Sequence, residues 1–188
     1  GFVTVFPCGS PRPNASNLNL VAGSTVPNNV IAKVGTGGKV CLFASRGTDL
    51  LVDVGGYFEP GTSYQAIVPG RLLDTRRDAV TLDGLGAGAG VAAAGSVTEV
   101  QVTGRSGVPS TASAVTLNVT VTQATGPGFV TVFPCGNTRP NASSLNYIAG
   151  STVPNGVIAK VGAGGKVCLF TSNGTHLLTD VGGYFVNP

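Results

Sequence analysis

Residues 1–9 read GFVTVFPCG, residues 39–43 read KVCLF and residues 53–58 read DVGGYF, and the same letters return at residues 128–136, 166–170 and 180–185. Aligned at an offset of 127 positions without a gap, the two stretches are identical at 47 of 58 positions. The residues between them occur once. Because a repeat of fixed period determines the architecture before any local pattern does, the chain is interpreted as half a repeat unit followed by a complete one.

The repeat predicts the domain boundaries. Residues 1–60 form the rear half of a repeat unit, residues 61–66 a linker, and residues 67–188 a complete unit with front half 67–127 and rear half 128–188. A unit of about 127 residues is long enough to enclose a hydrophobic core.

The composition indicates an ordered all-β protein. Of the 188 residues 29 are Gly, 42% are hydrophobic and 10% are charged. Short β-branched runs alternate with turns rich in Gly, Pro and Asn, and no segment repeats with a helical period. The clearest strand is residues 114–122 (AVTLNVTVT), where apolar and polar residues alternate as in a half-buried antiparallel strand. The predicted fold is an antiparallel β-sandwich, jelly-roll or immunoglobulin-like, without substantial helix.

Further predicted strands divide the first copy. They cover residues 2–6, 30–34, 39–43 and 50–54, and glycines follow the last of these. Residues 67–75 (IVPGRLLDT) read as one strand broken at Pro69 and Gly70. The Gly- and Ala-rich residues 83–95 are expected to be a mobile loop or to lie flat on the surface.

Four cysteines indicate the compartment. Cys8 and Cys41 are 33 residues apart, as are Cys135 and Cys168 at the equivalent positions. No C-x-x-C or Cys/His cluster matches the usual spacing of zinc ligands. One disulfide per rear half is the simplest prediction, with two reduced core cysteines as the alternative. Disulfides favour an oxidising, extracytoplasmic setting.

Charge and hydropathy make two kinds of partner unexpected. The net charge is +3, and the eleven basic residues form no cluster denser than Arg76 and Arg77, so we expect no nucleic-acid partner. No apolar run approaches the roughly 20 residues of a membrane-spanning helix. The N-terminal residues lack a signal-peptide pattern, which is typical of a mature or internal fragment.

Comparing the two copies tests each candidate for catalysis. The single histidine, His176, is replaced by Asp49 in the first copy, so a catalytic histidine is not expected. Asp53 and Asp180 occupy equivalent positions in apolar strands. A buried carboxylate must be paired, and we expect a structural role, with candidate partners that include Arg12, Arg139, Lys33 and Lys160.

The densest polar cluster is residues 71–78, RLLDTRRD. It lacks the spacing of a calcium loop, and we expect Asp74 to accept hydrogen bonds from Arg71 or Arg76. The sequence shows none of the common hydrolase, phosphate-loop or metalloprotease motifs. The prediction is therefore no enzyme, with no catalytic residues, no cofactor and no metal site. Sugar binding commonly uses exposed aromatic faces, and the candidates for glycan contact are Tyr64 and Tyr147, whereas Tyr57 and Tyr184 are expected to pack against glycines.

In order, the motifs PGRLLDTR, VTGRSGVP, ASAVTLNVT, VTVFPCG, RPNASSLN, AGSTVPN, GKVCLF and DVGGYF resemble a repeat module of secreted actinobacterial proteins. The resemblance covers residues 67–185 as one module and residues 1–58 as a rear half. It implies a location outside the cell or on its surface and a non-catalytic role.

These observations give two functional hypotheses. The first is a structural or assembly module of a stalk, fibre or filament. In it the rear half at residues 1–58, which lacks a front half, exposes a hydrophobic face that strands of another copy complete, giving an open head-to-tail polymer. The alternative is a glycan-binding or adhesion module that attaches a secreted enzyme to polysaccharide or cell wall.

Overall fold

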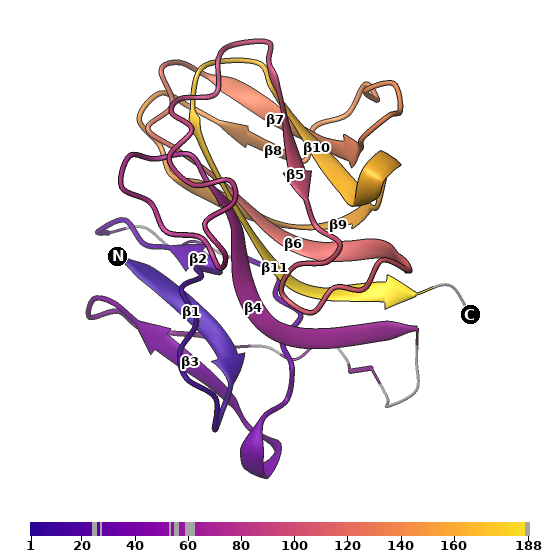
Figure 1. Cartoon of the computed structure of the whole chain (residues 1–188). Coiled ribbons are helices and arrows are strands. Elements are labelled where there is room, and N and C mark those ends of the chain that lie inside the picture. Colours follow the sequence, from indigo (N-terminus) through magenta and orange to yellow (C-terminus); the bar gives the residue numbers. More distant parts are fainter. Residues whose placement is uncertain (24–25, 27, 53, 55–56, 59–62, 187–188) are drawn as a thin grey trace.

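In the computed structural model of the chain, the regular secondary structure is almost entirely β-strand (Figure 1). The structure describes residues 1–23, 26, 28–52, 54, 57–58 and 63–186. The strands are β1 Phe2–Pro7, β2 Leu18–Asn19, β3 Val40–Ala44, β4 Tyr64–Asp74, β5 Val97–Gln101, β6 Ala112–Thr122, β7 Gly128–Pro134, β8 Leu145–Tyr147, β9 Val153–Lys160, β10 Lys166–Thr171 and β11 His176–Val186. The helical elements among these residues are two short 3₁₀ turns, Thr36–Gly38 and Ala163–Gly165. The predicted all-β fold is confirmed.

Two four-stranded antiparallel sheets form a sandwich around one core. Their strand orders are β4-β11-β6-β9 and β5-β10-β7-β8, and buried residues of both sheets pack in a single cluster. The alternation predicted for β6 is observed, since Val115, Leu117, Val119 and Val121 all lie in that core. Burying each such side chain stabilises the fold by about 1.5–3 kcal/mol. Strand β6 is not half-buried as predicted, however, because the polar residues on its other face are buried too. The front half supplies β4 and β6 to one sheet and β5 to the other, so neither sheet is complete without it.

Strand β4 differs from the prediction at two points. It begins at Tyr64, inside the predicted 61–66 linker, of which residues 61 and 62 lie outside the described residues. It also continues through Pro69, where a break was expected. The neighbouring strand β11 pairs with β4 through Gly183 opposite Ala66 and through Val181 opposite Gly70. Residues 67–69 of β4 therefore lie opposite the single residue Gly182, which makes a β-bulge. Because β4 is an edge strand, a proline without an N–H is tolerated there.

The first copy folds differently from the second, although the sequences are nearly identical. It forms a separate three-stranded sheet in the order β2-β1-β3, seen beside β4 in Figure 1. The strands predicted at residues 30–34 and 50–54 do not form at any of their described positions. In the complete unit the equivalent strands, β9 and β11, pair only with β4 and β6 of the front half. Without those partners the first copy has no ladder to join.

Apolar side chains of the first copy are consequently open to solvent. Leu51 is 89% exposed and Val54 is 86% exposed, whereas the equivalent Leu178 and Val181 are 5% and 0% exposed. The structure therefore shows the uncovered hydrophobic face that the missing front half predicts.

Both predicted disulfides are present. Cys8 is bonded to Cys41 and Cys135 to Cys168, with Cα atoms 5.0 Å apart in each pair. In each copy the bond joins the residue that follows one strand to a residue of its antiparallel neighbour. The alternative of reduced core cysteines is excluded in this structure.

The Gly- and Ala-rich loop at residues 83–95 is held to the sandwich by Arg105. Its guanidinium donates to both carboxylate oxygens of Asp83, at 2.8 and 2.6 Å, and to the carbonyl oxygens of Leu72, Leu85 and Gln101. Backbone hydrogen bonds also join Gly86 and Gly88 to Asp74 and Gly90 to Thr75, so the loop lies against the end of β4. Among the described residues, no helix is long and apolar enough to cross a membrane.

Candidate functional site

A row of four residues crosses the whole β4-β11-β6-β9 sheet. Asp180 on β11 pairs in register with Arg71 on β4 and with Asn118 on β6, and Asn118 pairs with Gly156 on β9. Asn118 alternates along β6 with the core residues, so its side chain lies on the sheet face opposite the core. We call Arg71, Asp180, Asn118 and Gly156 the polar row.

A buried ion-pair network forms one end of the polar row. Arg71 donates from Nε and Nη2 to the two oxygens of Asp180, at 2.7 and 3.0 Å, and from Nη1 to Asp74 at 3.1 Å. Arg76 forms a second bidentate pair with Asp74, at 2.9 and 2.7 Å. Arg71, Asp74 and Asp180 are all buried. The two guanidinium groups balance the two carboxylates, which is the condition for burying such charges.

The pKa shifts in this network follow from burial and from the ion pairs. Burial opposes the charge on Arg71, but the hydrogen bonds and charges of Asp180 and Asp74 outweigh it and raise the pKa of Arg71. Burial acts to raise the pKa of Asp74, and the hydrogen bonds and charge of Arg76 outweigh it, so that this pKa lies below its usual value. Full burial raises the pKa of Asp180, against the opposing influence of Arg71.

The first copy binds to the polar row through Ser16. The Ser16 amide donates to Asp180 Oδ2 at 2.9 Å, and the Ser16 carbonyl oxygen accepts from Asn118 Nδ2 at 2.5 Å. The Ser16 hydroxyl oxygen also accepts a longer hydrogen bond from Arg71 Nη2, at 3.5 Å. Ser16 and its neighbours Ala15 and Asn17 are buried. We call residues 12–17 the first docking loop.

Asn28 extends the contact to the far end of the polar row. Its Nδ2 donates to Asn118 Oδ1 at 2.8 Å and to the Asn17 carbonyl oxygen, and its Oδ1 accepts from the Gly156 amide at 3.1 Å. A Cβ atom at Gly156 would lie 2.6 Å from the Asn29 carbonyl oxygen. Glycine is therefore required for the two backbones to come this close. A narrow cleft lined by Asn17, Ile31, Asn118, Val157 and other residues of both copies marks the same boundary.

The predicted structural residues come together here, with one unexpected partner. Asp74 accepts from both Arg71 and Arg76, as expected. Asp180 is paired with Arg71, which was not among its four predicted partners. Two of those four instead stack on aromatic rings, Arg12 over Phe43 at 4.3 Å and Arg139 over Phe170 at 4.2 Å. Asp53, the carboxylate predicted to have the same structural role in the first copy, lies outside the described residues.

Sequence reasoning missed Ser16, Asn28, Asn118 and Gly156. Asn118 is an asparagine among threonines on the polar face of its strand, and the letters RPNAS at residues 12–16 are unchanged at residues 139–143 although the two residues before them differ. Those features were the available signals. That one copy would bind the other could not be read from them.

The two tyrosines predicted as glycan contacts are buried, and that prediction is wrong. Tyr64 is 5% exposed and Tyr147 is 4% exposed. Tyr64 packs against Phe58 and Phe185, with ring centroids 4.5 and 4.8 Å apart, and burial raises the pKa of its hydroxyl. The Tyr147 hydroxyl hydrogen-bonds Thr171 at 2.7 Å. Conversely Tyr57, which was expected to be packed, is largely exposed.

His176 lines an open depression together with Arg76, Arg77, Asp78 and Gln123. Its Nδ1 atom hydrogen-bonds the Thr75 hydroxyl at 3.0 Å, and that hydroxyl also accepts from the Leu177 amide at 3.0 Å. These bonds join the end of β4 to the start of β11. They give His176 a structural contact at the rim of the sandwich.

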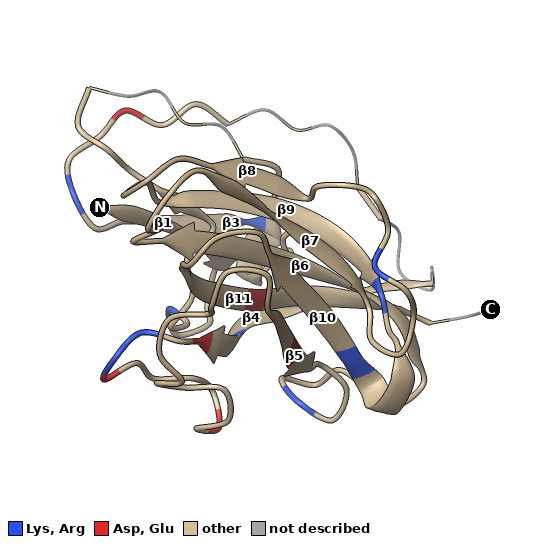
Figure 2. Cartoon of the chain, turned by 90° about the horizontal axis from the view of Figure 1, so that it is seen from above, with Lys and Arg blue, Asp and Glu red and all other residues tan. Residues whose placement is uncertain are grey.

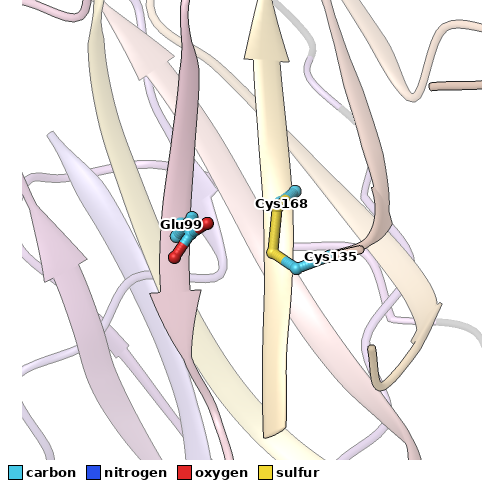
Figure 3. Close-up of side chains that lie close together, drawn as sticks. All are labelled: Glu99, Cys135 and Cys168. Atoms are coloured by element: carbon cyan, nitrogen blue, oxygen red, sulfur yellow. A yellow bond between two sulfur atoms is a disulfide. The ribbon is translucent and has the colours of Figure 1, made fainter. Parts of the chain in front are cut away.

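Glu99 lies beside the Cys135–Cys168 disulfide, on the neighbouring strand (Figure 3). The carboxylate and the two sulfurs are close enough together to suggest a metal site. Both sulfurs are joined to each other, however, and metal binding by cysteine requires a free thiolate. The Glu99 carboxylate pairs instead with Lys166 at 2.7 Å.

Charged residues are sparse and are spread over the molecule, many of them in loops (Figure 2).

Comparison of the chain with models of known protein families, with curated proteins and with solved structures finds no match. The polar row and its docking loop are therefore interpreted from their own geometry.

Proposed function

We propose that the chain is a non-catalytic, extracellular structural module whose repeat units join end to end in a stalk, fibre or filament. The observation that carries this proposal is the contact between the copies: the rear half of one unit is bound to the polar row of the next unit. A repeat that binds its neighbour in this way is a building block, because the contact recurs with each further unit that has the same polar row.

The open face of the first copy supports assembly by half-unit completion. The complete unit covers Leu177, Leu178 and Val181 with β4 and β6, and the equivalent residues of the first copy are exposed. The chain contains two rear halves and one front half, and that front half already belongs to residues 128–185. We infer that the strands that complete the first copy are those of a further front half.

The setting outside the cell is supported by chemistry and by resemblance. Two disulfides are typical of proteins that fold in an oxidising compartment. The ordered motifs resemble repeat modules of secreted actinobacterial proteins, for which a surface location is expected. A non-catalytic role is supported by the buried carboxylates, since Asp74 and Asp180 are each neutralised by arginines rather than positioned as an acid and a base.

The direct test supplies the first copy with a front half. Residues 64–127 are fused before Gly1, which reproduces the natural junction between Pro127 and Gly128. We expect residues 30–34 and 50–58 to become strands, because they gain the partners that β9 and β11 have. Hydrogen exchange at these amides should slow at least about a hundredfold, and binding of an apolar dye should fall.

The matched control is the same fusion with Val119→Asp in the added segment only. Val119 is fully buried in β6, so the added segment can no longer form a core. The control should retain the exposed face of the unfused chain. Equal exchange rates in the chain, the fusion and the control would reject half-unit completion.

A further inference from the structure

The second copy contains a loop equivalent to the first docking loop, and we propose that it binds the polar row of a further repeat unit. This second docking loop comprises residues 139–144. The proposal deepens the assembly function because it names the partner, another copy of the repeat unit, and the contact. It involves the rear half of the complete unit, so it is independent of whether the first copy is completed by a front half.

The two docking loops have the same internal hydrogen bonds. Thr4 Oγ1 donates to the Ala15 carbonyl oxygen at 2.7 Å, and Thr131 Oγ1 donates to the Ala142 carbonyl oxygen at 2.6 Å. The backbone bonds are duplicated too. The Asn17 amide donates to the Val3 carbonyl oxygen at 2.9 Å, and the equivalent Ser144 amide donates to the Val130 carbonyl oxygen at 2.8 Å. The second loop is thus held in the binding conformation before any partner arrives, which lowers the entropic cost of association.

The side-chain supports are also duplicated. Asn17 Oδ1 accepts from the Val5 amide at 2.7 Å, and Ser144 Oγ accepts from the Val132 amide at 3.0 Å. Asn155, the equivalent of Asn28, donates to the Ser144 carbonyl oxygen at 2.6 Å. Asn28 accepts from the Gly156 amide in the first copy. Its equivalent in the second copy, Asn155, is held next to the second docking loop.

Burial is what distinguishes the two loops. Ala15 is 3% exposed and Ser16 is 6% exposed, because they lie on the polar row. The equivalent Ala142 and Ser143 are exposed. A preformed loop with the sequence RPNAS thus has a partner in one copy and remains at the surface in the other.

The partner must be the polar row of another unit. The row in this chain is filled by the first docking loop. The first copy has Asn29 where the polar row has Gly156, and its described residues form no strand equivalent to β4 or β6 that could supply the arginine or the asparagine. The second docking loop therefore fits a vacant polar row, with its arginine, aspartate, asparagine and glycine, in another repeat unit.

The test empties the polar row of the full-length chain. Ala15→Arg places a long charged side chain at a buried position and should displace the first docking loop. The row is then free to accept the second docking loop of another molecule. Sedimentation velocity should show Ala15→Arg associating with increasing concentration. In the unmodified chain the tethered first loop competes at an effective concentration on the order of millimolar, so this contact should not form at micromolar protein.

Two double variants identify the contact. Adding Ala142→Arg to Ala15→Arg changes an exposed residue of the second docking loop and should weaken association at least about tenfold. Adding Asn137→Arg, a matched change at an exposed position just before that loop, should leave association unchanged. Near-ultraviolet circular dichroism verifies that each variant is folded.

Mixing provides a measurement that does not depend on self-association. The Ala15→Arg, Ala142→Arg double variant has a vacant row and no functional loop, whereas the unmodified chain has a filled row and a free loop. The two should form a one-to-one complex that Gly156→Val in the double variant abolishes. Absence of that complex, or association that persists in the Ala142→Arg variants, overturns the proposal without affecting half-unit completion.

Discussion

Arg71 connects the interior of the complete unit with the contact between copies. It pairs with Asp74 and Asp180 in a buried position, and Asp180 in turn accepts from Ser16 of the first copy. A lysine could not replace it, because a single ammonium cannot donate along three directions fixed in one plane. The residue therefore stabilises the fold and shapes the binding surface at the same time.

We expect Arg71→Ala to lower the free energy of unfolding by about 3–5 kcal/mol, because it leaves the buried carboxylate of Asp180 without a counter-charge. Arg76→Ala is the matched control. Arg76 also pairs with Asp74, but its side chain is 42% exposed, and loss of a pair open to solvent costs about 1 kcal/mol or less. Urea denaturation of the two variants measures the difference. Equal losses would mean that burial of the Arg71 network contributes nothing of its own.

At the residue scale the sequence predicted the types of interaction better than the partners. The need to pair Asp180 followed from its place in an apolar strand, and Asp74 was assigned its arginines correctly because they are near in sequence. Arg71 and Asp180 are 109 residues apart, and only the strand register brings them together. The burial of Tyr64 and Tyr147 has the same origin, since their surroundings come from distant strands.

At the element scale, strand formation depends on partners rather than on local sequence. Residues 30–34 (VIAKV) are identical to residues 157–161, yet only the second stretch contributes to a strand, β9. β-Propensity reflects packing against neighbours, and the front-half strand β6 is the neighbour that matters. Sequence reasoning predicted β1, β3 and β6 well because the chain contains their partners. It failed where the partner was absent.

The disulfides act on elements that pair within one half. Removing the Cys135–Cys168 bond by changing both residues to Ser should lower the free energy of unfolding by about 4 kcal/mol, because the bond closes a loop of 33 residues. Thermal unfolding of the variant and of the original chain provides the measurement. Converting Cys8 and Cys41 to Ser is the comparison, and it should leave unfolding of the complete unit unchanged within about 1 kcal/mol. A similar loss from both changes would show that the copies unfold as one cooperative unit.

At the scale of the whole molecule, the contact between copies relates a surface on one unit to a different surface on the next. Such a head-to-tail contact leaves one binding surface unoccupied on each end of the assembly. Further units therefore add until none remain or the assembly closes in a ring. The docking loop lies in the rear half, and the polar row crosses strands of both halves. Each unit that binds a neighbour therefore still carries one free surface for another.

Tandem proteins of two, four and six copies of residues 62–188 test this geometry, because that segment is one full period of 127 residues. If each docking loop binds the polar row of the next unit, the units are held rigidly. The maximum dimension from small-angle X-ray scattering should then rise by an equal increment for each added unit. Gly156→Val in every copy should break the contacts, and the dimension should then grow with about the square root of the number of units, as in a flexible chain. If both series grow alike, the docking contact does not order the array.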